Sequence, residues 1–140
     1  MERIVLATGC FDILHPAHLA FLKVAKEQGD VLIVGLETDA RVRQLKGKGR
    51  PLNPWKKRAA NLRQLKSVDR VVLLPALFNQ QAHHLAFLKK IKPTVLALSE
   101  NTPHLEKKKQ LTQHLGIQLY IFPFNPQYST SKLIFTRKLG

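Results

Sequence analysis

The feature that most constrains the fold of this chain is the alternation of short apolar segments with segments of helical spacing. The apolar segments are 3–7, 31–36, 70–74, 94–98 and 118–122. The helical segments are 16–28, a turn at 40–45, 55–65, 80–90, 104–115 and 131–138. Strands that are apolar on both faces and alternate with helices are typical of a parallel sheet covered on both sides. Because crossovers between parallel strands are right-handed, we expect an α/β fold with a doubly wound five-stranded parallel sheet.

Length and composition indicate a folded protein with one domain. The chain has 140 residues, of which 44% are hydrophobic, so residues 1–140 are expected to form a single domain. No apolar run approaches the roughly 18 residues of a membrane span. The first residues, Met1–Arg3, do not resemble a signal peptide. We therefore expect a cytoplasmic protein with no membrane partner. Cys10 is the single cysteine, which excludes an internal disulfide and a cysteine-cluster metal site.

Positive charge is concentrated in one segment. The net charge is +14, and residues 41–66 contain ten Lys or Arg and no acidic residue. Such a segment attracts polyanions, which include nucleotides, sugar phosphates and nucleic acid. A solvated basic surface without a specific partner is the alternative for most of these residues.

Two histidines, His15 and His18, follow the first predicted strand and stand where a helix begins. Side chains three residues apart lie on the same face of a helix. The free N–H groups and the positive end of the helix dipole lie beside them, which suits a polyphosphate. Imidazole N–H groups stabilise charge that develops on a phosphoryl oxygen. A metal site is disfavoured, because no further histidine or cysteine lies at local ligand spacing.

The position of this pair agrees with the predicted architecture. In doubly wound sheets, ligands bind beyond the carboxyl ends of the strands, where the strand order reverses. The first strand leads into Thr8 and Gly9, so the histidines fall at that place. A glycine there permits a sharp turn or a close approach to a ligand. Asp12 either braces the loop or helps to hold magnesium, and bracing is favoured.

Lys46 and Arg58 are candidates for binding phosphates. Lys46 lies in a segment with Gly47 and Gly49 that does not have the order of a Walker A loop. Arg58 is expected on the next helix, facing this segment, and a guanidinium is suited to bidentate binding of an anion. A salt bridge or plain solvation is the alternative for each. The remaining cations nearby are expected to be surface charges; they are Lys48, Arg50, Lys56 and Lys57.

A hydroxyl-rich segment precedes the last predicted helix. It consists of Tyr128 followed by Ser129, Thr130 and Ser131. Hydroxyls and free N–H groups at a helix start can bind a β- or γ-phosphate. The alternative is a simple helix cap, and the two interpretations are compatible.

Together these features resemble the cytidylyltransferase-like nucleotidyltransferases, which share an HxGH signature. Residues 9–18 read Gly-Cys-Phe-Asp-Ile-Leu-His-Pro-Ala-His, with Ala17 where the family has glycine. Residues 39–54, Arg58 and Val68–Asp69 look most like the adenylyltransferase domain of bacterial ADP-heptose synthases, and next like glycerol-3-phosphate cytidylyltransferases. Residues 129–131 are similar to the family's terminal S-T-T. Residues 97–102 lack the glycine and aspartate that the synthases carry there.

The resemblance implies a Rossmann-like fold with helices on both faces of the sheet, and a Mg²⁺-dependent reaction. In that reaction AMP or CMP moves from ATP or CTP to a phosphorylated acceptor such as a sugar phosphate, and pyrophosphate is released. The resemblance implies catalytic roles for His15, His18 and Lys46, and no metal site made by the protein itself. It implies nucleotide binding by Thr8, Gly9, Cys10, Phe11, Ser129, Thr130 and Ser131. It implies binding of the other substrate by Asp12, Asp39 and Arg58.

Three points stay open from the sequence. ATP is favoured over CTP only by residues 39–54. Homodimers are common in the family, but no residue pattern here tests that. The alternative to an enzyme is a catalytically impaired protein on the same fold, which binds nucleotides or binds nucleic acid through residues 41–66.

Overall fold

Five parallel strands form one sheet in the order β3-β2-β1-β4-β5. The computed structural model describes residues 2–76, 80–100, 102 and 104–123. The strands are β1 (Ile4–Gly9), β2 (Val31–Leu36), β3 (Arg70–Leu73), β4 (Val95–Ser99) and β5 (Gln118–Phe122). The five predicted strands are confirmed, and β1 extends two residues beyond its predicted end.

Among the described residues, five helices connect and cover these strands. They are α1 (Pro16–Glu27), α2 (Asp39–Lys46), α3 (Trp55–Arg63), α4 (Gln81–Ile91) and α5 (Leu105–Leu115). The helical turn predicted at 40–45 is confirmed as helical and is longer, forming the eight-residue helix α2. The Thr38 side chain caps it by accepting a hydrogen bond from the Arg41 backbone N–H, and Asp39 stands in its first turn. The helix predicted at 131–138 lies outside the described residues.

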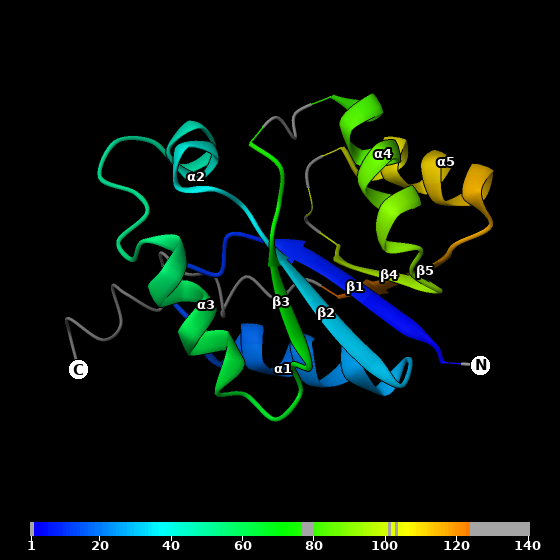
Figure 1. Cartoon of the computed structure of the whole chain (residues 1–140), viewed down its shortest axis with the longest axis horizontal. Coiled ribbons are helices and arrows are strands. Elements are labelled where there is room, and N and C mark those ends of the chain that lie inside the picture. Colours follow the sequence, from blue (N-terminus) through cyan, green and yellow to red (C-terminus); the bar gives the residue numbers. More distant parts are fainter. Residues whose placement is uncertain (1, 77–79, 101, 103, 124–140) are drawn as a thin grey trace.

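The sheet is apolar on both faces, as predicted. On one face, Val5, Ala7 and Val34 pack with Leu22 of α1 and Leu62 of α3. On the other face, the side chains of β1, β2 and β4 pack with those of α4 and α5; this cluster includes Leu6, Ile33, Leu96, Phe87, Leu88 and Leu111. Figure 1 shows α1 and α3 on one side of the sheet and α4 and α5 on the other. The doubly wound arrangement is therefore confirmed.

The strand order reverses between β1 and β4. Strand β1 pairs with β2 along Ile4–Gly9 and with β4 along Val5–Ala7. The chain leaves β1 to α1 on one face and leaves β4 to α5 on the other (Figure 1). The carboxyl end of β1 is thus the place where a ligand is expected. No helix in the described part of the chain is both long and apolar enough to cross a membrane.

Candidate active site

The rings of His15 and His18 are stacked at the start of α1. Their centroids are 3.9 Å apart and their planes differ by 26°. His15 is the N-cap residue in an extended conformation, and Pro16 follows at the first helical position, where its missing N–H costs nothing. His15 is 4% exposed. The structure therefore brings the two histidines together beside the helix N-terminus, as the spacing predicted.

His18 is held as a neutral ring. Its pKa is lowered from 6.5 to about 4, first by burial, then by the neighbouring His15 and by the charge of Lys46. A hydrogen bond with the Ile13 backbone acts in the opposite direction. The Phe11 ring stands edge-on to His18, with centroids 5.5 Å apart. A neutral imidazole is a hydrogen-bond donor at neutral pH, and a bound polyphosphate would favour its protonation.

Lys46 ends α2 close to this corner. Its charge acts on His18 and also on the Cys10 thiol, whose pKa is raised by burial despite that cation. Lys46 is exposed, and α2 stops there because Gly47 takes a φ of 96°. Gly49 also has a positive φ, 85°, and neither glycine has a neighbour near the position of a Cβ. The helix thus ends at Gly47 and leaves the Lys46 side chain exposed.

Asp12 braces the loop that carries the histidines. It is 3% exposed, and Oδ2 accepts from Arg50 Nε at 2.8 Å and from the Leu52 N–H at 2.7 Å. Oδ1 accepts from the Asn53 N–H at 2.8 Å, and Asn53 Nδ2 donates to the Asp12 carbonyl at 2.7 Å. Burial alone would raise the pKa of Asp12, but these hydrogen bonds and the Arg50 charge lower it. The favoured interpretation, bracing, is confirmed.

Arg50 corrects one prediction. It was expected to be a plain surface charge, but its side chain is only 21% exposed and forms an ion pair with Asp12. The buried carboxylate requires a cation or several donors, and Arg50 supplies both a charge and a hydrogen bond.

Arg58 is fully buried and connects three segments. Nη2 donates to Asp39 Oδ1 at 2.6 Å, Nη1 to the Cys10 carbonyl at 2.9 Å, and Nε to the Asn53 carbonyl at 3.0 Å. The salt-bridge alternative is therefore the one that the structure shows. Contact of Asp39 or Arg58 with substrate stays a prediction. The Arg58 guanidinium holds the loop that follows β1 through its hydrogen bond to the Cys10 carbonyl.

The turn at 8–11 lies at the carboxyl end of β1, as predicted. Gly9 accepts a hydrogen bond from the Glu37 N–H at 3.0 Å, and a Cβ on Gly9 would stand 3.0 Å from the Phe11 ring. The space beside Gly9 is thus filled by the Phe11 ring of the same loop. Binding of a nucleotide by Thr8, Gly9, Cys10 and Phe11 stays a prediction. Ser129, Thr130 and Ser131 lie outside the described residues.

No group of three or more His, Cys, Asp or Glu in the described part of the chain is arranged to hold a metal ion. Asp12, the carboxylate nearest the histidine loop, is occupied by the donors named above.

Sequence reasoning did not single out Glu37, Arg41 and Lys108. They come from the end of β2, from α2 and from α5, and their charges act on one another. Arg41 was noted only as part of the basic segment 41–66 and of residues 39–54, and Glu37 and Lys108 lie in no motif. The parallel topology brings the three to one edge of the sheet.

Comparison with protein families and curated proteins gives a consistent result. A family model described as cytidylyltransferase-like matches residues 6–134. The bifunctional protein HldE of Aliarcobacter butzleri is 38% identical over 133 residues, which are 95% of this chain and 26% of that protein. HldE of Alkalilimnicola ehrlichii is 56% identical over 71 residues, 51% of this chain and 15% of that protein. The chain thus spans about a quarter or less of the length of these two relatives.

Solved structures match over most of the chain. A lipopolysaccharide core biosynthesis protein from Thermoplasma volcanium has a TM-score of 0.69 and 28% identity, and the match covers 89% of this chain and 98% of that one. A pantoate–β-alanine ligase from Francisella tularensis has a TM-score of 0.67 and 17% identity, with coverage of 96% and 65%. The second match supports the fold alone. The Rossmann-like architecture and the family resemblance are confirmed.

Proposed function

The chain belongs to the cytidylyltransferase-like family of nucleotidyltransferases, and we propose that it moves AMP, or CMP, from a nucleoside triphosphate to a phosphorylated acceptor such as a sugar phosphate. The observation that carries this proposal is the stacked pair His15 and His18 beside the Lys46 charge, where β1 ends. The corner offers imidazole N–H donors, a helix N-terminus and the exposed Lys46 amine to one polyphosphate.

The proposed reaction is an in-line displacement at the α-phosphate. A phosphate oxygen of the acceptor forms a bond to the α-phosphorus, and the bond to the bridging oxygen of pyrophosphate breaks. Positioning and electrostatic stabilisation supply most of the acceleration in such transfers. The imidazoles and Lys46 donate to oxygens on which negative charge increases, while Asp12 and Arg58 hold the loop in place. Magnesium enters as part of the nucleotide substrate and neutralises phosphate charge.

ATP is the favoured nucleotide. The support is the resemblance of residues 39–54 to the adenylyltransferase domain of ADP-heptose synthases, together with the 38% identity to an HldE protein over 95% of the chain. The sugar phosphate acceptor is inferred from the same resemblance. A cytoplasmic location and a homodimer stay predictions.

Pyrophosphate release tests the proposal. The protein is incubated with Mg²⁺, with ATP or CTP, and with a panel of sugar phosphates. We expect release with ATP that requires both the acceptor and the metal. Tight nucleotide binding without release for any acceptor would favour the catalytically impaired alternative.

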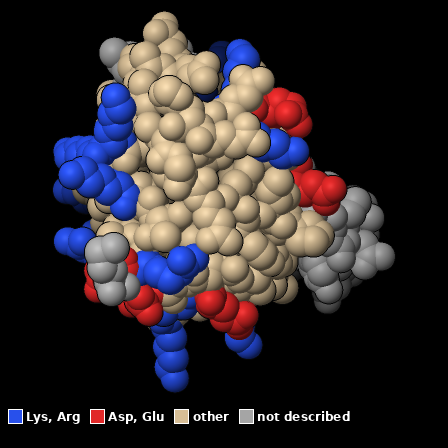
Figure 2. Space-filling view, turned by 90° about the vertical axis from the view of Figure 1, so that its right-hand side faces the viewer, with Lys and Arg blue, Asp and Glu red and all other residues tan. Residues whose placement is uncertain are grey.

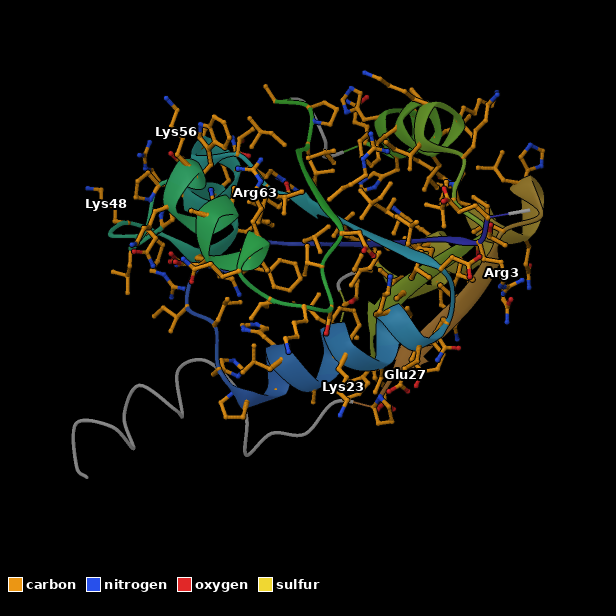
Figure 3. The ribbon with its side chains drawn as sticks, turned by 60° about the horizontal axis from the view of Figure 1, so that its bottom comes forward. Arg3, Lys23, Glu27, Lys48, Lys56 and Arg63 are labelled. Atoms are coloured by element: carbon orange, nitrogen blue, oxygen red, sulfur yellow. The ribbon has the colours of Figure 1, made fainter. Side chains whose placement is uncertain are left out.

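A second candidate, nucleic-acid binding, is favoured by the exposed part of the basic segment. Seven of its ten cations are exposed, whereas Arg41, Arg50 and Arg58 are not. Figure 3 shows Lys48, Lys56 and Arg63 at one end of the molecule, with Arg3 at the other end. The face in Figure 2 has a broad uncharged centre with charges at its margins. RNA binding that weakens steeply with salt, without turnover, would support this candidate.

A further inference from the structure

Glu37, Arg41 and Lys108 form a charged cluster at the edge of the sheet where the strands end. Glu37 follows β2 directly and its N–H donates to the Gly9 carbonyl at 3.0 Å, so it stands beside the end of β1. Arg41 lies in the first turns of α2, and Lys108 lies on α5. The three charges act on one another, yet no direct ion pair joins them in the described residues.

The cluster contains buried polar atoms that the described residues leave without a partner. Glu37 Oε2 and Arg41 Nε are both shielded from solvent and accept or donate no hydrogen bond. Arg41 Nη1 donates to Gln44 Oε1 at 3.1 Å. Buried charged groups are costly unless a partner satisfies them. The side chains are thus arranged for a third participant that both donates and accepts hydrogen bonds.

A small cavity adjoins the cluster between the sheet and helices α4 and α5. It has a volume of about 20 Å³, and its polar lining comes from Thr8, His84 and Lys108. The rest of the lining is apolar, from β1, β4, α4 and α5. A space of this size holds about one water molecule. A larger ligand would therefore lie on the polar rim, where Glu37 and Arg41 can bind it only by turning their side chains outward.

The end of β1 separates this cluster from the histidine corner. Thr8 faces the cavity, whereas the loop after Gly9 leads to His15 and His18. A transfer between two substrates requires two neighbouring sites with the reacting atoms between them.

We propose that Glu37, Arg41 and Lys108 form the acceptor half of the site. This proposal rests on the proposed function. Arg41 and Lys108 donate to the acceptor's phosphate, and Glu37 accepts hydrogen bonds from its hydroxyls. The fitting acceptor class is a phosphorylated polyol or sugar.

Binding measurements on single variants test this inference. The variants are Lys108→Met and Glu37→Gln, and the matched control is Lys107→Met, the exposed neighbour on α5. The probes are mannose 1-phosphate and glycerol 3-phosphate, titrated calorimetrically with Mg²⁺ and a non-hydrolysable ATP analogue present. We expect each test variant to weaken probe binding by about tenfold or more, since each loses a hydrogen bond to a charged group. The ATP analogue should bind all variants within about twofold of the wild type.

Three results would overturn the inference. The first is that both test variants bind the probes with wild-type affinity, and the second is that Lys107→Met weakens probe binding as much as the test variants do. The third is that neither probe binds the wild type saturably. Pyrophosphate release separates the two proposals. If the probes bind through the cluster but no acceptor supports release, the proposed function fails and the acceptor site stands. If release occurs with an acceptor KM unchanged by Lys108→Met and Glu37→Gln, the acceptor site fails and the proposed function stands.

Discussion

Arg50 Nε donates to Asp12 Oδ2 at 2.8 Å, so a cation from the loop after α2 neutralises a carboxylate from the loop after β1. The two residues lie far apart in sequence, and this ion pair joins the segment that carries Lys46 to the segment that carries His15. The relative position of the candidate catalytic groups therefore depends on this buried carboxylate, whose contact with substrate stays a prediction.

Asp12→Ala is expected to lower the free energy of unfolding by about 2–3 kcal/mol, because it leaves the Leu52 and Asn53 N–H groups and the Arg50 charge without their acceptor. Urea unfolding followed by circular dichroism measures this change. The control Glu27→Ala removes an exposed carboxylate from α1 and should stay within about 0.5 kcal/mol. A loss in Asp12→Ala no larger than that of the control would contradict the bracing role.

Arg58→Lys is expected to cost about 2 kcal/mol or more, although the charge is kept. A lysine carries its three N–H donors on one nitrogen, and Arg58 reaches Asp39, the Cys10 carbonyl and the Asn53 carbonyl from three separate nitrogens of a planar guanidinium. The single ammonium therefore cannot reproduce this geometry, and buried acceptors lose their donors. Chemical unfolding again measures the effect. The exposed Arg63 on the same helix provides the control, since Arg63→Lys should be nearly neutral. Equal stabilities of the two variants would refute this account of Arg58.

His18→Ala is expected to reduce nucleotidyl transfer by a factor on the order of 10²–10³, the usual cost of losing a donor to a transition-state oxygen. The measurement is the initial rate of pyrophosphate release, with circular dichroism confirming an intact fold. His114→Ala removes an exposed histidine on α5 and should retain full activity. Wild-type rates in His18→Ala would remove this residue from the mechanism.

The free energy of unfolding should depend on pH through the protonation of His18. Its pKa is about 4 in the folded protein and 6.5 as the ordinary value, so the unfolded chain binds the proton more readily. The folded state accordingly loses stability as pH falls from 6.5 towards 4, by roughly 3 kcal/mol at most, and the loss is complete below the folded pKa. Histidine resonances in NMR titrations measure the pKa, and ATP should raise it. A His18 pKa above 6 in the free protein would contradict the buried, neutral ring.

The sheet and its helices could be predicted because each strand segment is apolar on both faces and each helix has a clear start or stop, such as Pro16 or Gly116. Helix α2 was underestimated, since seven of its eight residues are not buried and its apolar pattern is weak. Its capping residue Thr38 is the signal that could have identified it.

The histidine corner could also be predicted, because its geometry depends on local spacing within one helix. The partners of Arg50 could not, since a cation in a glycine-rich loop has no local pattern that indicates a buried acceptor. The same holds for Glu37 and Lys108, which only the packing of α5 against the sheet brings together.

The two faces of the sheet pack against different hydrophobic clusters, with α1 and α3 over one face and α4 and α5 over the other. Because alternate residues of the same strands face the two clusters, a mutation that reshapes one cluster can leave the side chains of the other in place. Under the proposed function, a lineage with this architecture could therefore exchange its acceptor through changes around α5 while the histidine corner at α1 is inherited unchanged.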